Sequence, residues 1–329
     1  MFWCYMYSDR PSNLLRILVI PENNCNFHCS YCCFWDGKSL PKKSYTPDAS
    51  LYSFLVRGAV ESGCNRFMLT GGEPLLLNSE YLYNVVSNIS SVEGVRRFWI
   101  NTNGSLLVPE VSRKLVQNGL SEVVVSLSAD TREVFSNYTT VLSEVFETVV
   151  DNIASAVDAG IFVRIAVPLF RGGISTIDQF LGLISLLSDV GVRSVGYFGL
   201  HMTEENKDVF DDLYVDPNII TQGLLKNNDW SLTLADDGKK TFFNGKMQII
   251  IPTIQSGKSN NCLKNNCGKY CQGEYAAYLC FYGEKIYIRS CHREFDDRRN
   301  EFFIDNEIIA ERKMIDLARV YSSAWSYTK

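Results

Sequence analysis

Two patterns of apolar residues, one typical of strands and one of helices, alternate along the first 200 residues of the chain. Short apolar runs typical of buried strands are each followed by stretches with apolar residues at helical spacing. The runs predict strands at residues 14–20, 66–70, 97–101, 122–127, 161–168 and 193–200. The stretches between them predict helices at residues 47–62, 81–89, 109–119, 142–159 and 177–187. Such alternation implies a parallel α/β sheet with right-handed crossovers, whose ligands bind at the carboxyl ends of the strands.

The pattern changes after residue 200. Acidic residues and asparagines accumulate, which predicts a polar connector with one short helix at residues 217–225. Beyond it we expect a strand at 247–251, a hairpin from 275–281 and 285–289, and a terminal helix at 308–321. The predicted parts are an α/β domain over 1–200, a connector over 201–245, and a cysteine-rich α+β extension over 246–329.

Composition and charge exclude several classes of protein. The 329 residues are 46% hydrophobic with a net charge of −5, which disfavours a general nucleic-acid binder. No apolar run reaches the roughly 18–20 residues of a membrane span. The N-terminus has no basic segment before its apolar residues, as a secretory signal would have. We therefore expect a cytoplasmic protein with no nucleic-acid or membrane partner.

Three cysteines lie within eight residues, at the spacing Cys-x3-Cys-x2-Cys. They are Cys25, Cys29 and Cys32, and they follow the first predicted strand. An odd number of thiols cannot close a disulfide set, whereas thiolates this dense suit an iron–sulfur cluster. Three ligands leave one iron of a four-iron cluster open for chemistry. A zinc knuckle is the alternative, and it needs a nearby fourth ligand.

Polar motifs end three of the next strands. Gly71-Gly72-Glu73-Pro74 follows the second strand, and its glycines allow a ligand to approach the backbone closely. Thr102-Asn103-Gly104 follows the third strand, and Ser126 lies near the end of the fourth. Each alone is also compatible with an ordinary turn or strand residue.

Together, the cysteine loop and these motifs resemble the radical S-adenosylmethionine (SAM) superfamily. The resemblance implies a partial (β/α)6 TIM-type barrel, a [4Fe-4S] cluster on the three cysteines, and SAM bound to the open iron. Cleavage of SAM would then yield a 5′-deoxyadenosyl radical. The SAM-contacting residues implied by the resemblance are Tyr31, Gly71, Gly72, Glu73, Pro74, Thr102, Asn103 and Ser126.

A second group of cysteines lies near the C-terminus. It resembles the twitch or SPASM extensions of radical SAM enzymes, which carry auxiliary [4Fe-4S] clusters. The expected ligands are Cys267, Cys271 and Cys291, with Cys262 as the fourth. Cys280 is either a ligand or a small buried hydrophobe. A structural zinc site is the alternative for this group.

Within the superfamily, the chain resembles the subgroup that includes the GTP 3′,8-cyclases. Arg16 and Arg164 match basic positions that contact substrate in that subgroup. Two positions depart from its pattern, because Met68 and Glu274 stand where basic residues are expected. The subgroup's di-glycine tail is also missing, since the sequence ends in Thr328-Lys329. GTP is therefore not the expected substrate.

The expected function is abstraction of a hydrogen atom from a small-molecule biosynthetic substrate. Flavodoxin or ferredoxin would serve as the electron donor. A peptide-modifying maturase is the alternative. The small molecule is favoured, because only 24 residues precede Cys25, too few for a leader-peptide-binding domain. A metal-binding module without catalysis is the non-enzymatic alternative. His28 and His292 lie next to cysteines and are expected near the clusters or at the surface.

Overall fold

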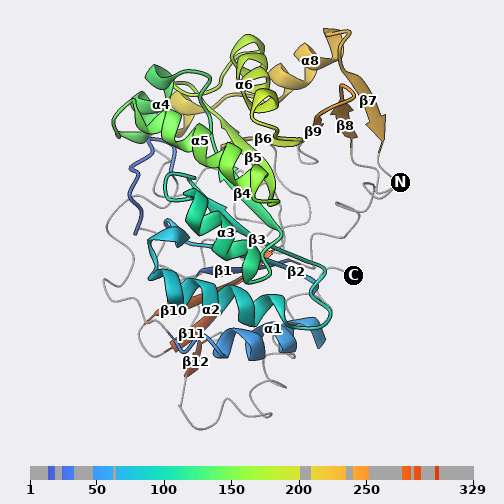
Figure 1. The fold of residues 1–329 in the computed structure, drawn as a ribbon. Coiled ribbons are helices and arrows are strands. Elements are labelled where there is room, and N and C mark those ends of the chain that lie inside the picture. Colours follow the sequence, from blue (N-terminus) through green and yellow to red (C-terminus); the bar gives the residue numbers. More distant parts are fainter. Residues whose placement is uncertain are drawn as a thin grey trace, which may run out of the picture.

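The structure is a computed structural model (Figure 1). It describes residues 14–18, 24–32, 47–61, 64–200, 209–234, 240–251, 276–282, 285–289 and 301–303. Outside these ranges lie the late cysteines Cys262, Cys267, Cys271 and Cys291, together with Glu274, His292 and the predicted terminal helix.

Six strands alternate with helices along residues 14–199. The elements are β1 (Leu14–Leu18), α1 (Leu51–Glu61), β2 (Arg66–Thr70), α2 (Ser79–Ser90), β3 (Arg97–Thr102), α3 (Pro109–Gln117), β4 (Glu122–Ser126), α4 (Arg132–Thr139), α5 (Val145–Asp158), β5 (Phe162–Leu169), α6 (Ile177–Asp189) and β6 (Ser194–Gly199). All six predicted strands are confirmed. Helix α4 was not predicted, because eight residues rich in Ser, Asn and Thr give a weak helical signal.

Side-chain caps and glycines set the ends of the helices. The Thr176 hydroxyl accepts a hydrogen bond from the Gln179 N–H at 3.3 Å, and the Gln179 side chain bonds back to the Thr176 N–H, which starts α6 with a capping box. Pro109 begins α3, where its missing N–H costs nothing. Gly119 follows α3 with a φ of 92°, a conformation that glycine adopts without strain.

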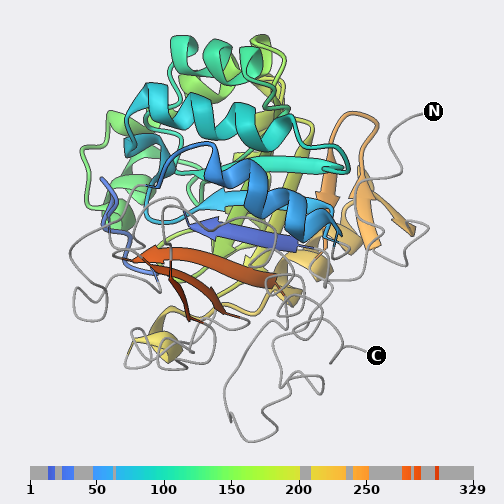
Figure 2. The ribbon, with the colours of Figure 1, turned by 90° about the horizontal axis from the view of Figure 1, so that it is seen from below.

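The described strands form one twelve-stranded sheet. Its order is β12-β11-β10-β1-β2-β3-β4-β5-β6-β9-β8-β7. Strands β1 to β6 stand in chain order and pair in parallel. Their carboxyl ends therefore lie at one edge of the sheet, with the connecting helices along one face (Figures 1 and 2).

Residues from after β6 extend the sheet at both ends. On one side, β9 (Gln248–Ile250) pairs in parallel with β6, and β8 (Lys240–Phe243) and β7 (Ser231–Leu234) follow antiparallel. On the other side, β10 (Ala276–Tyr282) pairs in parallel with β1, as Figure 2 shows, and β11 (Lys285–Arg289) and β12 (Glu301–Phe303) follow antiparallel. The predicted hairpin and the predicted strand at 247–251 are confirmed.

The connector region contains more structure than the sequence predicted. The expected short helix is α8 (Asn218–Lys226), which follows a single turn, α7 (Phe210–Leu213). Strands β7 and β8 were not predicted. Each is four residues long, and Leu232 and Phe243 are exposed although they are apolar. The sequence therefore does not alternate between buried apolar and solvated polar positions, the pattern by which a strand is recognised.

The hydrophobic core lies between the sheet and its helices. Alternate strand residues face the helices and are fully buried, among them Leu69, Ile100, Val125 and Ile165. Burying one such side chain contributes roughly 1.5–3 kcal/mol, so this layer supplies most of the stabilisation. The intervening strand residues lie on the opposite face, which we call the inner face.

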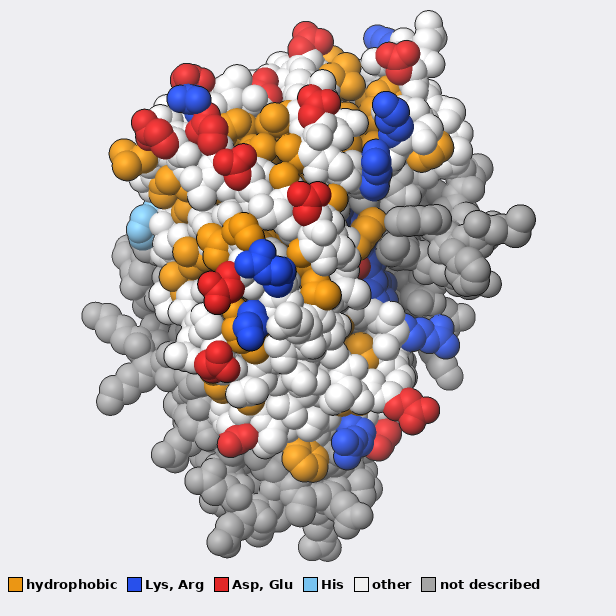
Figure 3. All heavy atoms as spheres, in the orientation of Figure 1, with side chains coloured by type: hydrophobic (Ala, Val, Ile, Leu, Met, Phe, Trp, Pro, Cys, Tyr) orange, Lys and Arg blue, Asp and Glu red, His pale blue; other side chains and the backbone are white. Residues whose placement is uncertain are grey.

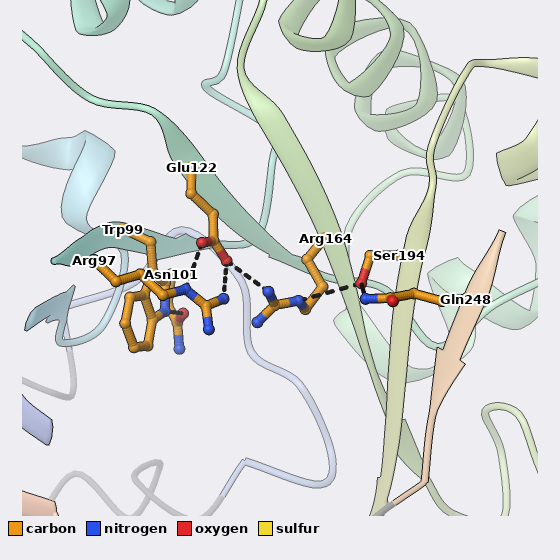
Figure 4. A network of polar contacts seen from close by, with 7 residues as sticks. All are labelled: Arg97, Trp99, Asn101, Glu122, Arg164, Ser194 and Gln248. Atoms are coloured by element: carbon orange, nitrogen blue, oxygen red, sulfur yellow. Dashed lines mark hydrogen bonds and ion pairs between the residues drawn. The ribbon is translucent and has the colours of Figure 1, made fainter. Parts of the chain in front are cut away.

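The inner face carries a buried polar network across five strands (Figure 4). Both oxygens of the Glu122 carboxylate accept bonds from the Arg97 guanidinium, with Nε at 2.6 Å, and Arg164 lies 3.0 Å away. The Arg164 Nε donates to the Ser194 hydroxyl at 3.4 Å, and the Gln248 amide donates to the same oxygen at 3.3 Å. The network lies toward the amino ends of the strands, since Glu122 begins β4.

An aromatic residue borders this network on β3. Trp99 is 5% exposed, and the Arg97 guanidinium lies 4.8 Å from the centre of its ring. Its indole N–H donates to the Asn101 side-chain oxygen at 3.0 Å. A side chain that is almost fully buried thus has its polar atom satisfied.

Figure 3 shows basic and acidic side chains interspersed over the face that it presents. Among the described helices, none is both long and apolar enough to cross a bilayer.

We predict that Glu122→Gln destabilises the fold by about 3 kcal/mol, because it takes the charge from a buried carboxylate between two arginines. The matched control is Glu147→Gln, which weakens the half-exposed bridge to Arg132 and should cost less than about 1 kcal/mol. Urea unfolding of both variants measures the difference. Equal, small losses in the two variants would contradict this account of the network.

Candidate functional site

The cysteine loop lies beside the carboxyl ends of the strands. In the stretch 24–32, all three of Cys25, Cys29 and Cys32 are half-buried. The Cys32 N–H donates to the Cys29 carbonyl at 3.0 Å, and the Phe27 N–H lies 3.4 Å from the Cys25 sulfur. These bonds give the loop two local turns, one at Cys25 and one between Cys29 and Cys32.

One end of the loop is fixed against the turn after β2. The Glu73 N–H donates to the Asn24 carbonyl at 2.9 Å. A Cβ atom on Gly72 would lie 1.9 Å from the same carbonyl oxygen, so no larger residue fits without moving the loop. The glycine in this motif is therefore required by the close approach of two backbones.

The other end of the loop is fixed to the end of α4. The N–H groups of His28 and Ser30 donate to the carbonyls of Thr139 and Tyr138 at 3.2 and 2.8 Å. Helix α4 thus helps to position the cysteines.

Glu73 is a buried carboxylate that joins two of the predicted motifs. It is 1% exposed, and it accepts bonds from the Thr102 hydroxyl at 2.7 Å, the Asn103 N–H at 2.7 Å and the Leu75 N–H at 3.0 Å. Burial raises the pKa of Glu73 to about 7, and the three donors oppose that shift. Because all three partners donate, the arrangement fits the ionised carboxylate.

Asn103 links the second motif to the cysteine loop. Its side-chain N–H group donates to the Asn26 side-chain oxygen at 2.8 Å and lies 3.8 Å from the Cys25 sulfur. Its own carbonyl oxygen accepts from the Ser105 N–H at 3.0 Å and the Ser105 hydroxyl at 2.7 Å. The Asn26 amide closes the ring by donating to the Ser105 hydroxyl at 2.9 Å.

An aromatic cluster supports the loop on its other side. The ring of Tyr31 lies 4.6 Å from that of Phe170 and 5.7 Å from that of Tyr138, measured between centroids. Phe27 meets Phe135 edge-on at 5.7 Å. The Tyr31 ring is therefore held by packing against Phe170 and Tyr138.

The chemistry of the three thiols fits a metal cluster. Burial raises the pKa of Cys25 and of Cys29, and the neighbouring thiols raise the pKa of Cys29 further. Metal binding requires thiolates, so a bound group must bring positive charge to this loop. Among the described residues, no three His, Cys, Asp or Glu side chains lie close enough together to bind a single metal ion. A four-iron cluster does not need such convergence, because each thiolate binds a different iron.

The structure gathers most of the predicted site residues. Glu73, Thr102 and Ser126 lie at or just beyond the carboxyl ends of β2, β3 and β4, and the cysteine loop contacts the first two of these turns. Arg164 lies apart, deep on the inner face, where its partner is Glu122. Arg16 lies on β1, paired with Met68, and only its backbone is described.

Several residues that shape the site were not predicted. Asn24, Asn26 and Ser105 hold the loop to the strand-end turns, and Tyr138 and Phe170 support Tyr31. Asn26, between two candidate ligands, carries a detectable signal, because its side chain offers both a donor and an acceptor. No sequence signal marks Tyr138 and Phe170, since their contacts join distant parts of the chain.

Comparison with known proteins identifies the domain. Residues 19–173 match the sequence model of the Radical SAM superfamily. A GTP 3′,8-cyclase from Staphylococcus haemolyticus (strain JCSC1435) is 31% identical over 197 residues, which cover 56% of this chain and 53% of that protein. Another from Haemophilus influenzae (strain PittGG) is 26% identical over 288 residues, covering 82% and 78%. The chain spans about half the length of the first of these relatives.

Solved structures share the fold. Streptococcus suis SuiB bound to S-adenosylmethionine superposes with a TM-score of 0.57 at 12% identity, covering 88% of this chain and 63% of that one. Native anSMEcpe with bound AdoMet and Cp18Cys peptide gives 0.56 at 14% identity, covering 94% and 83%. Identities this low establish the fold alone. The match over residues 19–173 leads to one conclusion of its own: the chain carries a radical SAM domain, an enzyme domain of that superfamily.

Proposed function

We propose that this protein is a radical SAM enzyme that abstracts a hydrogen atom from a small-molecule biosynthetic substrate. The observation that carries the proposal is the attachment of the cysteine loop to two strand-end motifs. Asn24 bonds to Glu73, and Asn26 bonds to Asn103. Candidate cluster ligands and candidate SAM contacts are therefore fixed to each other.

Cys25, Cys29 and Cys32 would hold the [4Fe-4S] cluster. Three thiolates leave one iron for the amino and carboxylate groups of SAM. When bound and reduced, the cluster supplies the electron that cleaves SAM to methionine and a 5′-deoxyadenosyl radical. The half-buried loop and its aromatic support would limit the access of water to that radical.

The strand-end residues would orient SAM. The backbone of Gly71, Gly72 and Pro74 offers carbonyl acceptors, with Glu73 ionised behind them. A bound ammonium group near Glu73 would lower the pKa of that carboxyl from about 7, which favours binding at neutral pH. Thr102, Asn103 and Ser126 would contact SAM from the ends of β3 and β4, and Tyr31 would lie beside the adenine.

The inner face would receive the substrate. Arg164 is held between Glu122 and Ser194, which supports a fixed positive charge at that wall. Arg16 on β1 is proposed as a second substrate-facing residue. The curated relatives named above act on GTP, a small molecule, but Met68 gives this chain a buried apolar residue in register with Arg16. Only the similarity in fold to the solved structures named above supports a peptide substrate.

Several finer features belong to the same proposal. The six units would form a partial (β/α)6 TIM-type barrel over residues 1–200, and a connector over 201–245 would lead to the cysteine-rich extension over 246–329. There Cys262, Cys267, Cys271 and Cys291 would hold an auxiliary [4Fe-4S] cluster. The donor would be flavodoxin or ferredoxin in the cytoplasm, where thiols stay reduced.

Cys29→Ala should abolish the formation of 5′-deoxyadenosine from SAM under reducing, anaerobic conditions. Loss of groups that merely support a metal ligand costs about 10–100-fold, so loss of a ligand should exceed about 100-fold. The matched control is Cys64→Ala, which removes a buried thiol that lies outside the loop and should retain activity. Far-ultraviolet circular dichroism checks that both variants fold. Cleavage of SAM by the Cys29 variant at the native rate would exclude the proposed cluster.

GTP should not be converted by the reduced, SAM-supplied protein. The apolar Met68 and the acidic Glu274 replace positive charge that would bind a triphosphate. The assay follows the cyclised guanosine product by mass spectrometry, with the Staphylococcus haemolyticus relative as the positive control. If the product forms at a comparable rate, these two positions do not decide the substrate.

Iron analysis should find about eight irons per reconstituted chain and no zinc. Replacing Cys25, Cys29 and Cys32 together by alanine should leave about four irons, and replacing Cys267 and Cys271 should also leave about four. Four irons together with one zinc in the unaltered protein would instead support a structural zinc site in the extension.

A further inference from the structure

We propose that Asn103 raises the reduction potential of the cluster on the cysteine loop by donating a side-chain hydrogen bond to the Cys25 sulfur. The inference rests on the proposed function, because it requires Cys25 to ligate the cluster. It gives Asn103 a role in electron transfer that is separate from any contact with SAM.

The orientation of the Asn103 amide follows from its surroundings. The Ser105 backbone N–H can only donate, and it lies 3.0 Å from one end of the amide, so that end must be the oxygen. The other end is therefore the N–H group, which has two protons. One points to the Asn26 oxygen at 2.8 Å, and the second is left for the Cys25 sulfur at 3.8 Å.

The amide is also held in place. The Asn103 backbone N–H bonds to the buried Glu73 carboxylate, and Asn26 and Ser105 close a ring around the side chain. A donor fixed before the cluster changes charge needs no rearrangement when an electron arrives. The Phe27 N–H, at 3.4 Å from the same sulfur, is a backbone donor that only a proline would remove, and a proline would also constrain the loop. Asn103 is therefore the donor to Cys25 that a variant can test.

The direction of the effect follows from charge. Reduction adds one negative charge to the cluster and its thiolates, and hydrogen-bond donors to the sulfurs stabilise the more negative state. Removing one donor should therefore lower the reduction potential. A single hydrogen bond contributes on the order of 1 kcal/mol net, so we expect about a three- to tenfold change in the ratio of reduced to oxidised cluster.

The test is an anaerobic redox titration of the full chain without SAM, followed by electron paramagnetic resonance. The signal of the loop cluster is the one that Cys29→Ala removes. Asn103→Leu keeps the approximate shape of the side chain but has no donor. At the wild-type midpoint it should show about a three- to tenfold lower ratio of reduced to oxidised cluster. It should also lose one exchangeable-proton coupling in electron–nuclear double resonance.

Two further variants separate this role from a structural one. Asn103→Asp keeps the acceptor for the Ser105 N–H but replaces the donor with negative charge, so its potential should fall further than that of the leucine variant. Ser105→Ala removes a hydroxyl that contacts Asn103 but not the sulfur. The Ser105 N–H and the Asn26 side-chain oxygen still hold the Asn103 amide, so the potential of this variant should stay close to that of the wild type.

Wild-type potentials and proton couplings in both Asn103 variants would overturn the inference while the proposed function stands. A wild-type protein without any signal that Cys29→Ala removes would instead overturn the proposed function, and the inference with it.

Discussion

The buried carboxylate of Glu73 is the contact on which the candidate site depends. It draws the turn after β2 and the turn after β3 together through bonds from Thr102 and Asn103. Its own backbone N–H fixes the start of the cysteine loop at Asn24. A buried carboxylate is costly unless it is hydrogen-bonded, and the three donors offset that cost only in this arrangement. The loop, the two turns and the carboxylate are consequently placed as one unit.

A second buried carboxylate, Glu122, performs a different task at the other end of the strands. It joins Arg97 and Arg164 on the inner face and links strands rather than turns. The two carboxylates therefore lie at opposite ends of the strands, with Glu73 beside the cysteine loop and Glu122 in the network on the inner face. Arg164 is bound to Glu122 near the amino ends of the strands, whereas the cysteine loop lies at their carboxyl ends.

The sequence predicted the fold where the hydrophobic pattern is strong. Strands such as β4 are nearly continuous apolar runs, so their positions follow from burial alone. Helix α4 and strands β7 and β8 escaped prediction because they are short and do not separate apolar from polar positions clearly. The cysteine spacing and the glycine motif indicated a candidate site, and the structure places the two side by side. The roles of Asn26, Ser105 and Tyr138 arise from contacts across distant segments, which no local pattern encodes.

The central claim is that SAM binds directly to the cluster held by the cysteine loop. Electron–nuclear double resonance on the reduced protein with SAM labelled with 15N at its amino group tests this most directly. The account predicts a 15N coupling to the cluster signal that Cys29→Ala removes, because three thiolates leave one iron open. A reduced cluster whose signal shows no coupling to labelled SAM at saturating concentration would contradict it.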